Sequence, residues 1–167
     1  MKLFKNIKKW LENQEHLFYL FLLILIVPNI ILCFTEPMPV VAKVCNVLLP
    51  FAFYYLLMTL SRNCGKMFWI LFLFIFFGAF QIVLLYLFGQ SIIAVDMFLN
   101  LVTTNSSEAM ELLDNLVPAL VSVIILYIPA LILAVISIIK KRKLSPEFIR
   151  RERKKAWIAL LIGFISL

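Results

Sequence analysis

Polar side chains recur every fourth residue in one short stretch of an otherwise very apolar chain. The stretch contains Asp96, Asn100, Thr104 and Glu108. On a helix these residues would form one polar stripe, because each step of four turns only about 40° around the axis. An amide and a hydroxyl can donate hydrogen bonds to phosphate oxygens, and a carboxylate can accept them from an ammonium group. The pattern alone favours a simpler interpretation, in which these side chains cap and solvate an outer loop.

The residues around this stripe have the composition of helices that lie on a membrane surface. Apolar residues fill much of the remaining circumference: Phe98, Leu99, Val102, Ala109, Leu112 and Leu113. Asn105 followed by Glu108 resembles a capping box, which would begin a second helix near Ser106 and bend the stripe at Thr104. We therefore expect two short amphipathic helices that meet at Thr104, within an outer connector at residues 89–115.

The composition of the chain favours a membrane environment. Hydrophobic residues make up 64% of its 167 residues, and the mean hydropathy is +1.05. A soluble core could not enclose so many apolar side chains, whereas helices in lipid expose them and satisfy their backbone groups internally. We therefore expect an all-α membrane protein. The net charge of +7 comes from basic blocks beside apolar runs, which indicates topology and not a nucleic-acid partner.

Apolar runs predict a bundle of four full transmembrane helices, since about 20 helical residues cross about 30 Å of hydrocarbon. The spans are expected at residues 17–34, 44–60, 67–88 and 116–139. Residues 156–167 form the start of a fifth span that is too short to cross, so we expect a longer protein. Residues 1–16 alternate basic and apolar positions and predict a cytoplasmic interfacial helix with the lone His16 at its edge.

Charged residues are distributed unequally between the connectors. Residues 1–9, 62–66 and 140–155 are basic, whereas 89–115 contain no Lys or Arg and four acidic residues. Basic connectors stay in the cytoplasm, so the N-terminus is expected inside and residues 89–115 outside. In this interpretation 140–155 simply anchor the cytoplasmic side; a site for anionic lipid headgroups is the alternative.

The rest of the sequence offers little chemistry. The three cysteines lack metal-ligand spacing, and the single His cannot complete a set with Ser and Asp. Cys33 and Cys45 fall near the outer ends of two predicted spans, where a disulfide could form, although free thiols are commoner there. The predicted span interiors lack Asp, Glu, Lys and Arg, which disfavours a transporter or channel but leaves that class, and a membrane scaffold, open. We predict no catalytic, metal-binding or cofactor-binding residue in this chain.

Residues 95–113 resemble the signature of a known family. They read Val-Asp-Met-Phe-Leu-Asn-Leu-Val-Thr-Thr-Asn-Ser-Ser-Glu-Ala-Met-Glu-Leu-Leu. This segment is similar to the outer loop of the lipopolysaccharide phosphoethanolamine transferases, which include the mobile colistin-resistance enzymes that confer polymyxin resistance. The layout of the chain is also similar, since the family has five spans, a cytoplasmic N-terminus and a soluble domain of the sulfatase/alkaline-phosphatase type in the periplasm, outside the bacterial inner membrane.

The resemblance implies a two-step transfer. Phosphatidylethanolamine would give its headgroup to an enzyme threonine, and lipid A or a core sugar of lipopolysaccharide would then accept it. The membrane-side substrate residues would be Asn100, Thr104 and Glu108. The nucleophile and the zinc ligands would belong to the soluble domain, so residues 1–167 alone are expected to be inactive and to hold no cofactor.

Overall fold

The computed structural model describes the backbone of residues 6–7, 10–88 and 106–166 and the side chains of 6–7, 10–83 and 117–166. Its elements in chain order are α2 (Gln14–Thr35), α3 (Val40–Met58), α4 (Cys64–Ile70), α5 (Phe72–Phe88), α7 (Ser106–Ile139) and α8 (Pro146–Ile165). Residues 6–7 and 10–12 are also helical, in the segment predicted to form an interfacial helix. All regular elements among the described residues are helices, so the all-α prediction is confirmed for this part of the chain.

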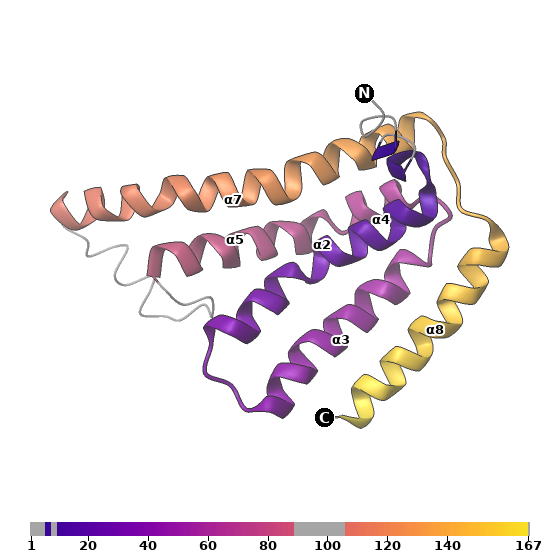
Figure 1. Cartoon of the computed structure of the whole chain (residues 1–167), viewed down its shortest axis with the longest axis horizontal. Coiled ribbons are helices and arrows are strands. Elements are labelled where there is room, and N and C mark those ends of the chain that lie inside the picture. The colour runs from indigo at the N-terminus through magenta and orange to yellow at the C-terminus, as the bar shows by residue number, and fades with distance from the viewer. Residues whose placement is uncertain (1–5, 8–9, 89–105, 167) are drawn as a thin grey trace.

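The helices lie side by side in the order α7, α5 with α4, α2, α3 and α8 (Figure 1). α2 lies in the middle of this row and contacts α3 on one side and α4, α5 and α7 on the other. Its packing on α4 includes Phe21 stacked on Phe68, with ring centroids 4.4 Å apart. Both rings are fully buried. α2 is therefore the central helix of the bundle.

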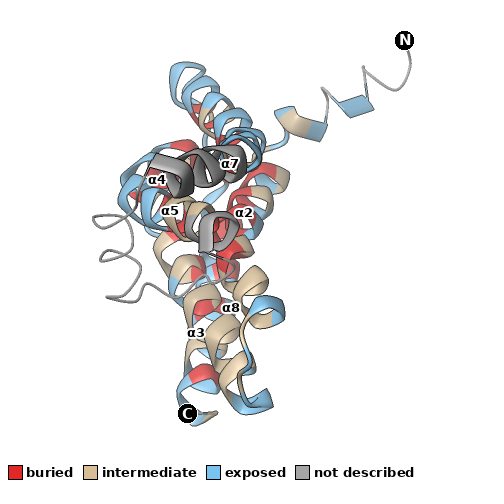
Figure 2. Ribbon diagram, turned by 90° about the vertical axis from the view of Figure 1, so that its left-hand side faces the viewer, coloured by how far each residue is buried: buried red, intermediate tan, exposed pale blue. Residues whose placement is uncertain are grey.

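Several helices have the length and composition of membrane spans. α2, α3 and residues Val117–Ile139 of α7 are long and apolar enough to cross, and α4 with α5 passes the same test as a bent pair. Figure 2 shows exposed residues on the outer sides of the helices and buried residues between them. The exposed residues include large apolar side chains such as Leu73, Val117 and Ile125. Such surfaces suit lipid better than water, in agreement with the predicted helical membrane protein.

The predicted third span, 67–88, is divided in the structure. α4 begins three residues earlier, at Cys64, because the Asn63 side chain caps it by accepting a hydrogen bond from the Lys66 N–H at 2.8 Å. At Leu71 the backbone leaves helical geometry, with ψ at 10°. The axes of Cys64–Ile70 and Phe72–Val83 consequently differ by 62°.

α7 is one continuous helix over two segments that were predicted to be separate helices. Its helix begins at Ser106, the start that the capping-box pattern predicts, but it then continues to Ile139. Residues 106–115, expected in a separate connector helix, are thus continuous with the span expected at 116–139. Helix-forming residues such as Ala109, Met110 and Leu112 favour this continuity. The other predicted short helix, before Thr104, lies outside the described residues.

α8 also differs from the expectation. Residues 140–155 were expected to connect two spans, but a helix begins at Pro146 and continues to Ile165. Ser145 caps this helix, since its hydroxyl accepts a hydrogen bond from the Phe148 N–H at 3.1 Å. Pro146 in the first turn has a fixed φ that suits a helix start, and Glu147 matches the positive end of the helix dipole. The basic residues 150–155 are therefore helical.

Basic connectors meet at one end of the bundle. The Gln14 side-chain oxygen, at the start of α2, accepts hydrogen bonds from Ser137 at 2.7 Å and from the Cys64 thiol at 3.4 Å. Arg62 Nε donates to the Leu144 carbonyl at 3.0 Å. These contacts hold the starts of α2 and α4 against the end of α7, so connectors 59–63 and 140–145 lie together. The start of α7 lies at the opposite end, with the loop between α2 and α3 (Figure 1).

Candidate functional site

The predicted substrate residues lie largely outside the described part of the chain. Asn100 and Thr104 are not described, and Glu108 is described only in its backbone, which lies in the first turn of α7. Whether the three side chains share one face therefore stays a prediction. The start of α7, which contains the Glu108 backbone, lies at the end of the bundle away from the basic connectors (Figure 1).

The first turn of α7 carries the partial positive charge of a helix N-terminus. The first N–H groups of an α-helix have no partner within the helix and form the positive end of its dipole. Such helix ends bind phosphate groups readily. Ser106 and Ser107 begin this helix, and Glu108 follows them directly.

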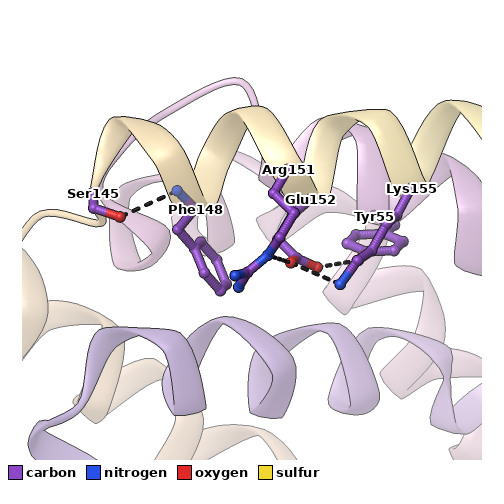
Figure 3. A network of polar contacts seen from close by, with 6 residues as sticks. All are labelled: Tyr55, Ser145, Phe148, Arg151, Glu152 and Lys155. Carbon is purple, nitrogen blue, oxygen red and sulfur yellow. Dashed lines mark hydrogen bonds and ion pairs between the residues drawn. The ribbon is translucent and has the colours of Figure 1, made fainter.

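A second polar cluster lies at the basic end, between α8, α3 and α2 (Figure 3). Its centre is the carboxylate of Glu152, whose side chain is fully buried. Tyr55 of α3 donates its hydroxyl to one carboxylate oxygen. The other oxygen accepts from Arg151 Nε at 2.9 Å and from Lys155 Nζ at 3.0 Å. We call these four residues, Tyr55, Arg151, Glu152 and Lys155, the Glu152 cluster.

The Glu152 carboxylate stays ionised in this environment. Burial by itself raises the pKa of a carboxyl group, because it disfavours the charged form. Hydrogen bonds act in the opposite direction and come from Tyr55, Arg151, Lys155 and Tyr19. Together they outweigh burial and lower the pKa of Glu152 to about 2. The same contact raises the pKa of Arg151. The cluster therefore combines one negative and two positive charges.

Aromatic rings close the cluster toward α2. Phe148 packs edge-on against Phe18, with ring centroids 5.5 Å apart, and lies 6.0 Å from Tyr19. The Arg151 guanidinium lies over the Phe148 ring, 5.3 Å from its centroid. This stacking orients the guanidinium while most of its side chain remains exposed. α8 is thereby fixed to α2 as well as to α3.

Sequence reasoning missed Glu152 because the surrounding basic residues suggested an anchor segment. Two signals could have found it. Ser145-Pro146-Glu147 is a typical helix start, with an N-cap residue, Pro in the first turn and an acidic residue after it. On the resulting helix, Glu152 shares a face with the buried residues Phe148, Ile149, Ala156 and Gly163. An acidic residue on an otherwise apolar or small-residue face indicates a buried, partnered carboxylate.

A smaller polar contact joins α2 and α3 nearer the other end. Asn46 donates to the Asn29 carbonyl oxygen at 2.9 Å, and the two side-chain amides are also hydrogen-bonded, at 3.3 Å. The Cys33 thiol donates to the Lys43 carbonyl. Cys33 and Cys45 are both free thiols in the structure, so the possible disulfide is not formed. The contact is a packing interaction between α2 and α3.

The described residues contain no group of three or more His, Cys, Asp or Glu side chains that could hold a metal ion. The zinc expectation concerned a further domain and stays a prediction.

No protein-family model, curated protein or solved structure matches this chain. The likeness to phosphoethanolamine transferases therefore depends on the sequence of residues 95–113 and on the layout of the helices.

Proposed function

We propose that this chain is the membrane domain of a phosphoethanolamine transferase of the bacterial inner membrane. Phosphatidylethanolamine would be the donor, and lipid A or a core sugar of lipopolysaccharide the acceptor. α2, α3, the bent pair α4 and α5, and α7 would be four full spans, and the later part of α8 would begin a fifth. The N-terminus would lie in the cytoplasm and residues 89–115 in the periplasm.

The observation that carries this proposal is the segment 95–113 together with its place in the fold. Its last part forms the start of α7, at the end of the bundle opposite the basic connectors. Basic connectors remain on the cytoplasmic side of a membrane, which would place this end at the outer surface. A donor lipid in the outer leaflet would present its headgroup there.

The proposed roles follow from side-chain chemistry. Glu108 would accept hydrogen bonds from the ammonium of the headgroup, while Asn100 and Thr104 would donate to its phosphate. The bond-making step needs an activated nucleophile, which the proposal assigns, with its zinc ion, to a soluble domain following this chain. The membrane domain would position the donor, so its residues affect transfer through binding geometry.

Glu108→Gln tests the headgroup assignment. A hydrogen bond to a charged group contributes roughly 1.5 to 3 kcal/mol, so loss of the carboxylate should lower kcat/KM for headgroup transfer roughly ten- to a hundredfold. Glu111→Gln is the matched control, because it removes the same charge from the same helix without the four-residue spacing. The variants are made in the longer enzyme and assayed with phosphatidylethanolamine as donor.

Two outcomes would contradict the assignment. Full activity of Glu108→Gln would show that the carboxylate does not contact the headgroup. Equal losses in Glu108→Gln and Glu111→Gln would mean that the general acidity of this region matters and that the stripe does not.

Single cysteines test the proposed orientation. Thr35, the last residue of α2, and Lys66, in the first turn of α4, are both exposed and lie at opposite ends of the bundle. With Cys33 and Cys45 changed to Ser, an impermeant thiol reagent on intact spheroplasts should label Thr35→Cys but not Lys66→Cys. Cys64 can remain, because it is fully buried. The reverse labelling would invert the topology.

A further inference from the structure

Positive charge is concentrated at the start of α8 and in the connector before it. Residues 140–155 contain nine basic and two acidic residues, a net charge of +7 that matches that of the whole chain. On α8 itself the basic residues are Arg150, Arg151, Arg153, Lys154 and Lys155. They do not form one uniform surface, because the helix turns each of them in a different direction.

Two pairs of basic residues with the same spacing lie on different faces of α8. At about 100° per residue, Arg150 and Lys154 lie about 160° from the buried Glu152 and face away from the bundle. Neither has an ion-pair partner among the described residues. Arg151 and Lys155 lie beside the buried face, about 60° to 100° from Glu152. Arg151 rests on Phe148, which places this flank next to α2.

The Arg151 and Lys155 pair is fixed in position by the protein. Both side chains donate to the same oxygen of Glu152, which is itself fully buried. Arg151 uses only its Nε for this contact, and Lys155 only one of its three donors, so both retain donors for a ligand. Their side chains remain 60% and 54% exposed. With Glu152, the pair carries one net positive charge.

The surface changes from charged to apolar just below this pair. Ile158 and Ile162 continue the same flank of α8 at helical spacing and are 57% and 54% exposed. A polar headgroup beside Arg151 and Lys155 would therefore have apolar side chains directly beneath it. Along this flank a charged region is followed by an apolar region, which is the order of the headgroup and the acyl chains in a phospholipid.

We propose that Arg151 and Lys155, held by Glu152, bind the phosphate of an anionic phospholipid whose acyl chain lies along Ile158 and Ile162. One net positive charge in the cluster complements the one negative charge of a phosphodiester headgroup that lacks an ammonium group. The site therefore prefers phosphatidylglycerol to phosphatidylethanolamine. It lies at the opposite end of the bundle from α7's first turn and does not depend on the proposed transferase function.

The test compares two double variants of the whole chain. Arg151→Gln with Lys155→Gln removes the proposed site, and Arg150→Gln with Lys154→Gln removes the same charge from the outward face. Delipidated protein in mild detergent is titrated with phosphatidylglycerol or phosphatidylethanolamine of the same acyl chains, and bound lipid is counted by native mass spectrometry. The site variant should bind phosphatidylglycerol roughly ten- to a hundredfold more weakly, and the control less than about threefold.

Glu152→Gln separates a built site from general electrostatic attraction. This change adds one positive charge to α8, so attraction by net charge alone would strengthen binding of an anionic lipid. A site that depends on fixed positions of Arg151 and Lys155 instead loses affinity. We expect weaker binding of phosphatidylglycerol, with thermal unfolding of each variant measured in the same detergent to verify that it is folded.

Several outcomes would overturn the proposal. Equal weakening in the two double variants, stronger binding by folded Glu152→Gln, or equal affinity for the two lipids would show a non-specific basic surface. Displacement of bound phosphatidylglycerol by millimolar inorganic phosphate would assign the site to a free anion. A dimer that is lost only in the Arg151 and Lys155 variant would assign it to a second copy of the chain. If the site variant unfolds, the single changes Lys155→Gln and Lys154→Gln provide the same comparison.

Discussion

Tyr55→Phe isolates the contact between α3 and α8. The change keeps the ring and its packing against Phe51 and Phe18, whose ring centroids lie 5.5 Å and 6.0 Å away. It removes only the hydroxyl that donates to Glu152. A hydrogen bond to a charged group contributes roughly 1.5 to 3 kcal/mol. Since Arg151 and Lys155 still neutralise the carboxylate, we expect the free energy of unfolding to fall by about 1.5 kcal/mol, the lower end of this range.

Tyr54→Phe is the control for this change. It removes a hydroxyl from the neighbouring residue of the same helix, and that hydroxyl makes no hydrogen bond to the described residues. We expect it to change the free energy of unfolding by less than about 0.5 kcal/mol. Unfolding is followed by far-ultraviolet circular dichroism in mixed micelles with increasing SDS.

A double-mutant cycle then assigns the effect to the pair. In a Glu152→Gln background the acceptor charge is already absent, so Tyr55→Phe should cost about 1 kcal/mol less than in the wild type. Additive effects of the two changes would refute the coupling. Equal destabilisation by Tyr55→Phe and Tyr54→Phe would also refute it, because it would show that the hydroxyl of Tyr55 contributes nothing specific.

Two further predictions concern stability. A Cβ on Gly65 would lie 2.4 Å from the Ala134 backbone oxygen of α7, whereas a Cβ on Gly163 would lie 2.9 Å from the movable end of the Leu49 side chain. Gly65→Ala should therefore lower the melting temperature in detergent, and Gly163→Ala should lower it much less. Equal effects of the two changes would contradict the close contact of α4 with α7. The pKa of Glu152 is lowered from 4.5 to about 2, so its contribution to stability is complete above pH 4.5 and lost as pH falls toward 2. The difference in melting temperature between wild type and Glu152→Gln should accordingly shrink between pH 5 and pH 3, and a constant difference would count against an ionised, hydrogen-bonded carboxylate.

Long apolar runs made much of the fold predictable. The spans expected at 17–34 and 44–60 correspond to α2 (Gln14–Thr35) and α3 (Val40–Met58). Their ends were predictable because a span must be long enough to cross the hydrocarbon, and because the prolines between the two apolar runs limit where a helix can begin and end. The bend at Leu71 was not predictable in this way. Its local sequence contains neither Pro nor Gly, so no local signal distinguishes it from the surrounding Phe-rich helix.

The two polar sites differ in how far sequence could define them. The stripe of Asn100, Thr104 and Glu108 is a local pattern, so it can be recognised without a structure, but its geometry stays a prediction. Glu152 is the opposite case. Its hydrogen-bond donor Tyr55 lies 97 residues earlier in the chain, and no local pattern connects the two.

Glu152 also explains how so basic a helix can lie against apolar neighbours. Small residues Ala156 and Gly163 allow α8 to approach α3, and at Gly163 even one added carbon would lie 2.9 Å from Leu49. A carboxylate on that face would be costly without partners, because burial disfavours its charge. Here its ion-pair partners are the exposed cations Arg151 and Lys155. Glu152 thus helps to hold α8 against the bundle and also holds two positive charges beside an apolar surface. Any change that releases Glu152 therefore alters both the packing of α8 and the proposed lipid site.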